Sequence, residues 1–595
     1  MKKFIGLLCA LTMLLSIGVA ACAAPGSETV EPAEQVTADT ETPAPAVEKA
    51  EPRFTPGTYT SEQMGHNGPL TVQVTFTEDA ITEVSVPQHS ETRRIGDAAI
   101  DAVASTVVEH QTLKVDAVSG STVTRAAVLR GVTDCLAQAG GEPSDLQDYV
   151  APVTDDEEIT TQIVVVGAGG AGMSAAVEAA QLGADVVVLE KLATIGGSTG
   201  HSSGVILYTD DDFTVDDYVE LHLERAHSDE KIARRIAMDA AANVEWLTSM
   251  GWVWYPRPQV VDNKWNAARA NPDPDGKSVR PNGMTIIDAL ENAANKTGKV
   301  SIRLNTRATE LIVKDGVVVG VKAVRSDGSK LTVHADAVIL ATGGFDNGEL
   351  ARELQPAIYN AKHVSAVGNV GDGIAMIEAV GGVSSYTAPA LGQGNTNWMN
   401  TLNLPENFLE VNGDGNRFVA EDAHYMVEMD AMLASPNPNF AYLFDSNNDV
   451  TVLEELVAKG TMVKAGTIEE LAQKMNINVE GLKATVARYN ELAGKEDVDF
   501  GKAKELMLGF SKAPFYGIKA YAEILLSFGG PVVNEECEFL TADGSVIPGV
   551  YGAGELVNSK LFVVGYSYGG GAIQHAIATG RIAARNAFEN YVKSR

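Results

Sequence analysis

A glycine-rich turn between a strand and a helix constrains the fold of this chain more than any other feature. The apolar run Ile163 to Val166 predicts a buried strand, and the turn Gly167 to Gly172 and an alanine-rich helical stretch follow it. A second apolar run ends at Glu190, about 20 residues further on, where a dinucleotide fingerprint has the acid that binds ribose. The glycines permit a tight turn, and the helix N-terminus attracts a pyrophosphate. We therefore expect an α/β domain with a Rossmann-like dinucleotide site.

Three more glycine motifs narrow the class of dinucleotide protein. They are Gly196-Gly197-Ser198-Thr199-Gly200, Ala341-Thr342-Gly343-Gly344 and Gly549-Val550-Tyr551-Gly552-Ala553-Gly554-Glu555. Together with the fingerprint they resemble the flavoprotein subunit of fumarate reductase and succinate dehydrogenase, with its soluble relatives urocanate reductase and 3-ketosteroid dehydrogenase. The resemblance covers about residues 158–595 and implies non-covalent FAD. Because only one fingerprint is visible and FAD occupies it, nicotinamide is not expected as the electron donor.

The resemblance also implies how the domain is built. We expect FAD-binding parts at 158–385 and 528–595, with an α+β capping domain that binds substrate at 386–527. The final helix, entered at Gly569 to Ile573, would point its N-terminus at the flavin. The implied cofactor-binding residues are Gly167, Gly169, Ala171, Gly172, Glu190, Ser198, Thr199, Gly204, Gly343, Asp372, Glu555, Ala572 and Ile573.

A small α+β module precedes the FAD domain. Residues 53–141 show short alternating strands, a helix from about Gly96 to His110, and a helix ending near Ala139; residues 142–157 read as a linker. The segment Asp116 to Thr122 resembles the site where a flavin transferase esterifies FMN, which implies an FMN-binding domain with a phosphoester at Thr122. Ser121 adds a second hydroxyl where the family has alanine. The alternative is that these hydroxyls only cap the helix.

The N-terminus predicts export. Lys2 and Lys3 precede an apolar run, and small residues precede Cys22, so residues 1–22 resemble a lipoprotein signal peptide in which Cys22 is acylated. An ordinary secretory signal is the alternative. Residues 23–52 lack large apolar side chains and predict a flexible tether. We expect an extracytoplasmic protein, lipid-anchored to a bacterial membrane at the cell surface or in the periplasm.

Charge and cysteine content exclude several partners. A net charge of -33 repels nucleic acid. The four cysteines include Cys22 and offer no haem, zinc or iron–sulfur spacing, so no metal is expected and electrons must travel on flavins. The expected partners are a membrane electron-donor system, a flavin transferase and a small-molecule acceptor.

Two residues are predicted to act in catalysis. Arg417, in the segment Gly415 to Glu421, matches the family position whose arginine gives a proton to an alkene carbon; a solvated arginine beyond a turn is the alternative. Tyr566 lies where ketosteroid dehydrogenases have a tyrosine that hydrogen-bonds the substrate carbonyl, although a core-packing role is equally open.

The carboxylate-binding residues of fumarate reductases are missing from this chain. Leu525, Leu526 and Ser527 stand where these enzymes have a histidine just before the position of Phe528, and Ser567 stands where they have an arginine. The capping-domain Thr-Glu and arginine are absent from Asn400 to Leu404. A dicarboxylate would lose its hydration without enough partners, so fumarate is disfavoured.

These inferences predict a flavin-dependent reductase of an activated C=C bond in an enone or an unsaturated, aromatic acid. Electrons would pass from FMN to FAD, hydride would go to the β-carbon and Arg417 would protonate the α-carbon. One alternative is a ketosteroid-type flavin dehydrogenase, or a urocanate- or fumarate-like reductase. A non-enzymatic alternative is a surface flavoprotein that only relays electrons.

Overall fold

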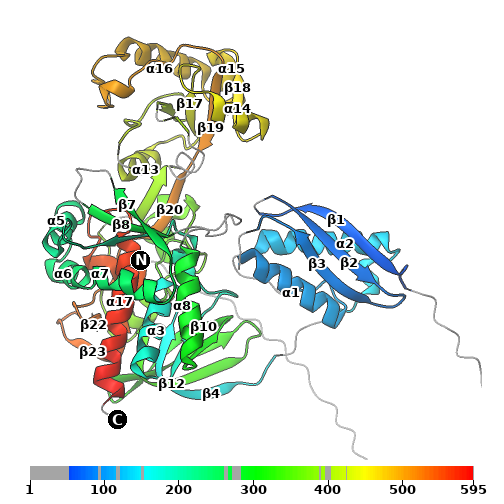
Figure 1. Cartoon of the computed structure of the whole chain (residues 1–595), viewed down its shortest axis with the longest axis vertical. Coiled ribbons are helices and arrows are strands. Elements are labelled where there is room, and N and C mark those ends of the chain that lie inside the picture. Colours follow the sequence, from blue (N-terminus) through cyan, green and yellow to red (C-terminus); the bar gives the residue numbers. More distant parts are fainter. Residues whose placement is uncertain are drawn as a thin grey trace, which may run out of the picture. The chain divides into compact units, whose positions relative to one another are not determined.

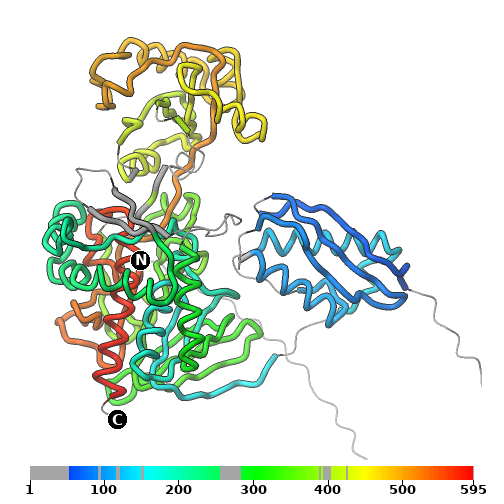
Figure 2. Tube along the Cα trace, in the orientation of Figure 1, coloured from blue at the N-terminus to red at the C-terminus, as the bar shows by residue number. Residues whose placement is uncertain are grey.

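The structure is a computed structural model of the 595-residue chain. It describes residues 53–66, 68–91, 95–115, 121–148, 153–259, 265–270, 283–387, 390–394, 404–405, 407–423 and 425–593. Within these ranges no helix combines the length and the apolar character needed to cross a bilayer. The main bodies of the chain can be followed by colour in Figures 1 and 2 and are described one at a time.

The N-terminal module is a three-stranded antiparallel sheet with two helices packed on it (Figure 1). Its elements are β1 (Gly57–Met64), β2 (Pro69–Phe76), β3 (Ile81–Gln88), α1 (Ile95–His110) and α2 (Thr122–Gln138). In β2 every second side chain from Leu70 to Phe76 is buried, which is the period of a strand with one face in a core. Gly131 lets α2 lie close to this strand, because a Cβ there would stand 2.3 Å from Val72. The strands and helices predicted for this module are confirmed.

The second body is built on an eight-stranded sheet whose central strands are parallel. Its strands are β4 (Glu157–Val166), β5 (Val186–Leu189), β9 (Val300–Arg303), β10 (Thr306–Lys314), β11 (Val317–Arg325), β12 (Lys330–Leu340), β22 (Glu538–Leu540) and β23 (Val546–Gly552). Strand β23 pairs with β12 in parallel. The C-terminal stretch of the chain therefore returns to the sheet that β4, β5 and β9 to β12 build. This return agrees with a domain made of two separate stretches of sequence.

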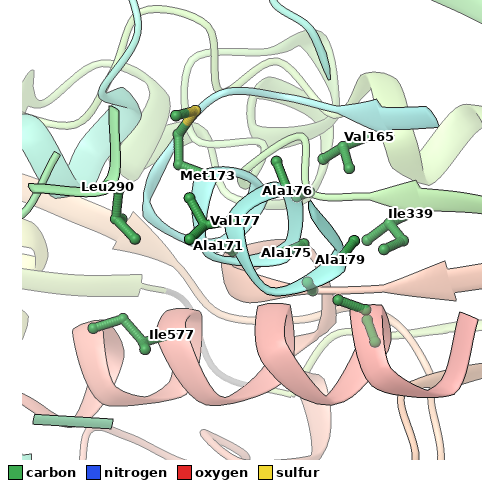
Figure 3. Close-up of a cluster of buried hydrophobic side chains, with 14 of the residues drawn as sticks. Val165, Ala171, Met173, Ala175, Ala176, Val177, Ala179, Leu290, Ile339 and Ile577 are labelled. Carbon is green, nitrogen blue, oxygen red and sulfur yellow. The ribbon is translucent and has the colours of Figure 1, made fainter. Parts of the chain in front are cut away.

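Two long helices pack together on this sheet. They are α3 (Gly170–Leu182), which follows the fingerprint, and α17 (Gly571–Ala587), near the C-terminus. Figure 3 shows side chains of α3, among them Ala175 and Ala179, in one buried cluster with Ile577 of α17. Small residues allow this contact, since a Cβ at Gly580 would stand 2.3 Å from the carbonyl oxygen of Ala171. The contact fixes the starts of both helices beside one cavity.

Other helices and strands complete this body. The helices are α4 (Gly197–His201), α5 (Val215–Ala226), α6 (Glu230–Met238), α7 (Ala240–Ser249), α8 (Met284–Thr297), α9 (Glu349–Leu354), α10 (Pro356–Tyr359) and α11 (Asp372–Glu378). The strands are β6 (Val205–Tyr208), β7 (Trp254–Gln259), β8 (Trp265–Ala270), β13 (Lys362–His363), β14 (Ser384–Ser385), β15 (Ala390–Gly394), β20 (Ala522–Ser527) and β21 (Gly530–Pro531).

The inserted segment forms its own antiparallel sheet of four strands, in the order β16-β17-β19-β18. The strands are β16 (Leu409–Val411), β17 (Phe440–Phe444), β18 (Val463–Ala465) and β19 (Phe515–Ala520). Its helices are α13 (Tyr425–Ala434), α14 (Thr451–Ala458), α15 (Ile468–Met475) and α16 (Val479–Leu492). Two apolar clusters on this sheet give the segment a core of its own, and its role as a capping domain stays a prediction.

Candidate flavin sites

A large cavity lies at the carboxyl ends of the parallel strands, where open α/β sheets bind ligands. It contains about 1070 Å³ of space free of atoms, its open mouth included. Segments far apart in the sequence line it, among them the turn after β4, the end of β5, the loops after β12 and the start of α17. The position of the cavity and its glycine-rich lining suit a dinucleotide.

The three fingerprint glycines are needed for different reasons. A Cβ at Gly167, whose φ is +104°, would stand 2.3 Å from the carbonyl oxygen of Ala341, and a Cβ at Gly172 would stand 1.8 Å from that of Gly167. Gly169 differs, because its nearest neighbour would be the Cα of Gly197 at 3.7 Å. Gly167 and Gly172 therefore permit the turn and its packing, whereas Gly169 leaves the backbone open to a ligand at the N-terminus of α3.

Glu190 lines one end of the cavity. Its carboxylate accepts hydrogen bonds from the N–H groups of Ala168, at 2.8 Å, and Leu192, at 2.9 Å. Burial raises the pKa of Glu190, and these two N–H groups act against the increase. The side chain is thus fixed beside the fingerprint turn, a position suited to binding ribose hydroxyls.

Asp372, also in the lining, pairs with two cations from other segments. Lys191 Nζ lies 2.7 Å and Arg307 Nη2 lies 2.6 Å from its carboxylate oxygens. Burial raises the pKa of Asp372, but the hydrogen bonds from Arg307 and Lys191 outweigh burial and leave the pKa below its ordinary value. This trio carries one net positive charge, which suits a bound pyrophosphate.

The glycines after Thr342 make room for a buried hydrogen-bond network. A Cβ at Gly343 would stand 2.3 Å from Asn369 Oδ1, and a Cβ at Gly344 would stand 2.0 Å from Ser527 Oγ and 2.1 Å from Glu555 Oε1. Glu555 Oε1 accepts from Ser527 N at 2.9 Å and Ser527 Oγ at 3.0 Å, and Glu555 Oε2 accepts from Asn369 Nδ2 at 3.1 Å. The motif therefore brings three distant segments together beneath the cavity.

Replacing Gly344 by alanine should displace Glu555 and Ser527. Overpacking of this kind costs about 1–3 kcal/mol of folding stability, which denaturant unfolding measures. We also expect the purified variant to retain less FAD, which its FAD content measures. Gly565→Ala is the matched control, because its Cβ would meet nothing closer than the carbonyl oxygen of Arg225 at 3.8 Å. Equal effects of the two substitutions would contradict this account of the motif.

Ser198 offers a hydroxyl proton to the cavity. Its oxygen accepts from Ala366 N at 3.1 Å and from Asn369 Nδ2 at 3.2 Å. Both lone pairs are therefore occupied, and the hydroxyl can act only as a donor to a third group. A donor in this position fits an anionic ligand.

Most of the predicted cofactor residues line the cavity. They are Gly167, Gly169, Ala171, Glu190, Ser198, Thr199, Gly343, Asp372, Glu555, Ala572 and Ile573. Gly172 lies behind the turn, and Gly204, with a φ of +66°, precedes β6; neither is in the lining. Sequence reasoning missed Asn369 and Asp346, although each had a signal: Asn369 lies in a glycine-rich turn before Asp372, and Asp346 follows Gly344 by two residues.

Tyr566 and Ser567 lie in the loop that leads into α17. The hydroxyl oxygen of Tyr566 accepts a hydrogen bond from Ala572 N at 2.8 Å, and the ring packs on Phe562 with centroids 5.1 Å apart. Burial raises the pKa of Tyr566 to about 12. Tyr566 is not in the cavity lining, so its substrate role stays a prediction beside the core-packing alternative.

Ser567 is fully buried, and its hydroxyl lies 3.1 Å from His222 Nε2. His222 is also buried and stacks on Tyr218 at a centroid distance of 4.6 Å. Burial, followed by the influence of His575, lowers the pKa of His222 to about 3. The position that holds an arginine in fumarate reductases thus contacts a neutral imidazole here.

Arg417 is enclosed within the capping domain. Its Nε donates to Glu421 Oε1 at 2.9 Å, and its Nη2 donates to Glu421 Oε2 and to Asp497 Oδ2, both at 2.8 Å. The guanidinium also lies over the rings of Tyr489 and Phe500, at 5.0 and 4.8 Å. The alternative of a solvated arginine is wrong, since only 5% of the side chain is exposed. Its role as proton donor stays a prediction.

In the N-terminal module, Thr122 and Ser121 differ in exposure. Thr122 is the first residue of α2 and is exposed, whereas Ser121 is 4% exposed. The Ser121 side chain makes no capping hydrogen bond to the helix. A transferase would reach the Thr122 hydroxyl far more easily, which favours Thr122 as the FMN acceptor. The preceding residues, 116–120, lie outside the described ranges, as do the signal, Cys22, the tether and most of Asn400 to Leu404.

Comparisons with known proteins agree with this geometry. The FAD binding domain family matches residues 162–572, and the FMN-binding domain family matches residues 65–137. A NADH:acrylate oxidoreductase from Vibrio harveyi is 30% identical, over 90% of this chain and 61% of its own length. A urocanate reductase from Eggerthella lenta is 29% identical, over 89% of this chain and 92% of its own.

Among solved structures, the open conformation of a flavocytochrome c3 fumarate reductase matches with a TM-score of 0.62 and 27% identity, over 74% of this chain and 79% of the other. The fold and the cavity therefore define a flavoprotein that combines a FAD domain with an FMN domain. The chain belongs to the FAD-binding-domain family. The predicted α/β fold, the resemblance to fumarate and urocanate reductases, and the two flavin domains are confirmed.

Proposed function

We propose that this protein is an oxidoreductase that reduces an activated C=C bond, with electrons passing from FMN to FAD to the substrate. The names of its relatives support the reaction class, since one acts on acrylate and another on urocanate. The chain spans 61% of the acrylate relative, so the full activity of that protein is carried over only as a proposal.

The apolar side chains in the cavity lining argue against a dicarboxylate substrate. Leu525 and Leu526 line the cavity, together with Phe562 and Ile573. Lys191 and Arg307, the cations of the described lining, are both paired with Asp372. A dicarboxylate entering here would lose its hydration and find at most the one net positive charge of these three side chains. An enone or an unsaturated aromatic acid is the substrate class that we propose.

Bound FAD would supply the hydride, and FMN on Thr122 would supply electrons to it. The chain's own residues would then position the acceptor and provide a proton. Tyr566, whose hydroxyl oxygen accepts from Ala572 N, is the residue that we propose as hydrogen-bond donor to a substrate carbonyl. Arg417 is the proposed proton donor to the α-carbon, and Glu421 or Asp497 would pass it a replacement proton taken from solvent.

Two alternatives make different predictions. A ketosteroid-type dehydrogenase would pass electrons from a saturated ketone to a high-potential acceptor, which a reductase would not do. A surface relay would reduce dyes or other carriers without an alkene. The predicted lipid anchor and extracytoplasmic location remain part of the proposal, and replacing Cys22 by serine should release the protein from membranes.

The substrate class is tested by a matched pair of alkenes. The photoreduced protein is mixed anaerobically with fumarate or with its dimethyl ester, and flavin reoxidation is followed by absorbance. We expect the ester to react at least about 100-fold faster after correction for the same pair with free reduced FMN, because an unpaired buried charge costs several kcal/mol. Faster reaction with fumarate would contradict a site that disfavours dicarboxylates. Enones and urocanate extend the panel.

A further inference from the structure

Two buried carboxyl groups share one amide beneath the FAD cavity. Asn369 Nδ2 lies 3.1 Å from Asp346 Oδ1 and 3.1 Å from Glu555 Oε2, and the same nitrogen lies 3.2 Å from Ser198 Oγ. Asp346 is fully buried, and Asn369 is 3% exposed. Glu555 and Asn369 line the cavity, whereas Asp346 lies behind them. The arrangement is separate from the acid and cations at Asp372.

The side-chain amide of Asn369 has fewer hydrogens than the oxygens around it could accept. A side-chain amide nitrogen carries two hydrogens, and here three oxygens compete for them. Glu555 Oε1 is already satisfied by the N–H and hydroxyl of Ser527, so only Oε2 is short of donors. An oxygen short of donors in a buried carboxyl group favours protonation.

Asp346 has the surroundings of an ionised carboxylate. Its Oδ2 lies 3.1 Å from His363 Nδ1 and accepts from Asn347 Nδ2 at 3.1 Å and from the Ser365 hydroxyl. Burial lowers the pKa of His363, but the hydrogen bond to Asp346 and its charge outweigh burial and raise the pKa above its ordinary value. Of the two carboxyl groups, Asp346 is therefore the one that keeps the negative charge.

The other titratable groups around the cavity leave this assignment unchanged. Burial, followed by the charge of Asp346, raises the pKa of Glu555 to about 8. On α17, burial lowers the pKa of His575 to about 4, so that its imidazole is neutral above this range. Lys191 and Arg307 form their ion pairs with Asp372.

We propose that Asp346, acting through Asn369, holds Glu555 as a neutral acid that donates its proton into the cavity as a hydrogen bond to an acceptor oxygen of bound FAD. A neutral acid avoids repulsion of the cofactor's phosphates, which an ionised carboxylate in the same lining would cause. Glu555 then binds the cofactor directly, while Asp346 and His363 are positioning residues that set its protonation. The inference depends on FAD binding and not on the identity of the alkene.

The test is the pH dependence of FAD retention by the full-length holoprotein between pH 6 and 10. Released FAD is separated by ultrafiltration and quantified by chromatography, which distinguishes it from FMN. For the unaltered chain we expect the affinity to fall about tenfold per pH unit above about pH 8, as Glu555 loses its proton. Glu555→Gln, which mimics the neutral acid, should bind FAD within about threefold of the unaltered chain at pH 7 and remove the fall.

Two further substitutions should move the profile in opposite directions. Asp346→Asn removes a negative charge beside Glu555, so Glu555 ionises more easily and FAD should be lost from a lower pH. His363→Gln leaves the negative charge of Asp346 less neutralised, so Glu555 ionises less easily. The loss of FAD should therefore begin at a higher pH. The proposal would be overturned if the pH profile of Glu555→Gln paralleled that of the unaltered chain. It would also be overturned if this variant bound FAD at least about tenfold more weakly at pH 7. Shifts of both profiles in the same direction would also overturn it.

Discussion

Replacing Thr122 by alanine should abolish covalent flavin on the chain while leaving FAD in place. A phosphoester needs a side-chain oxygen, and Thr122 presents an exposed one at the start of α2, where free N–H groups and the helix dipole favour a phosphate. Because the residue is exposed, the free energy of unfolding should change by no more than about 0.5 kcal/mol. Mass spectrometry of the peptide and in-gel fluorescence, after expression with a flavin transferase, measure the result.

Two control variants separate the hydroxyl from the position. Ser121→Ala should keep full FMN loading, because the Ser121 side chain is buried. Thr122→Ser, which keeps a hydroxyl at the same position, should retain part of the FMN loading. Loss of flavin from Ser121→Ala with full loading of Thr122→Ala would show that the neighbouring hydroxyl is the acceptor.

Replacing Arg417 by alanine should destabilise the capping domain by about 3–5 kcal/mol, because it leaves buried charges without partners. The Glu421 and Asp497 side chains are each fully buried, and the guanidinium holds both. Lys502 Nζ lies 3.5 Å from Glu421 and cannot replace the bidentate contact. Denaturant unfolding followed by a capping-domain fluorophore measures the loss, and Arg488→Ala, an exposed arginine of the same domain, is the control.

Replacing Arg417 by lysine separates the role of this residue in catalysis from its role in stability. Arg417→Lys keeps the positive charge and part of the ion pairing. If Arg417 is the proton donor, this variant should still fold and accept electrons into FAD, and its alkene reduction should fall by about 10²–10⁴-fold. Alkene reduction near the level of the unaltered chain would assign Arg417 a structural role alone.

The sequence is sufficient for the parts of the fold that depend on local chemistry. The fingerprint turn, β4 and α3 follow from glycines, two of which (Gly167 and Gly172) leave no room for a Cβ, and from an apolar run next to them. The same reasoning places Glu190 at the end of β5 and beside the turn. Such features need no knowledge of distant residues.

Long-range pairings could not be predicted from the sequence. Asp497 lies 80 residues after Arg417, and nothing in its local sequence indicates that the two meet. Asn369 is linked to Glu555 across 186 residues, and its role depends on space that Gly343 leaves. The burial of Ser121 beside the exposed Thr122 is also a tertiary effect, since both residues carry similar hydroxyls.

The central claim, that two flavins on one chain feed one alkene site, is tested most directly by counting product. Protein carrying both flavins is fully reduced under anaerobic conditions, freed of excess reductant and mixed with a reactive enone, and the saturated product is quantified per chain. Each reduced flavin holds two electrons and each alkene takes two electrons and two protons. The account predicts two product molecules per chain, falling to one in Thr122→Ala; one product molecule from each protein would contradict it.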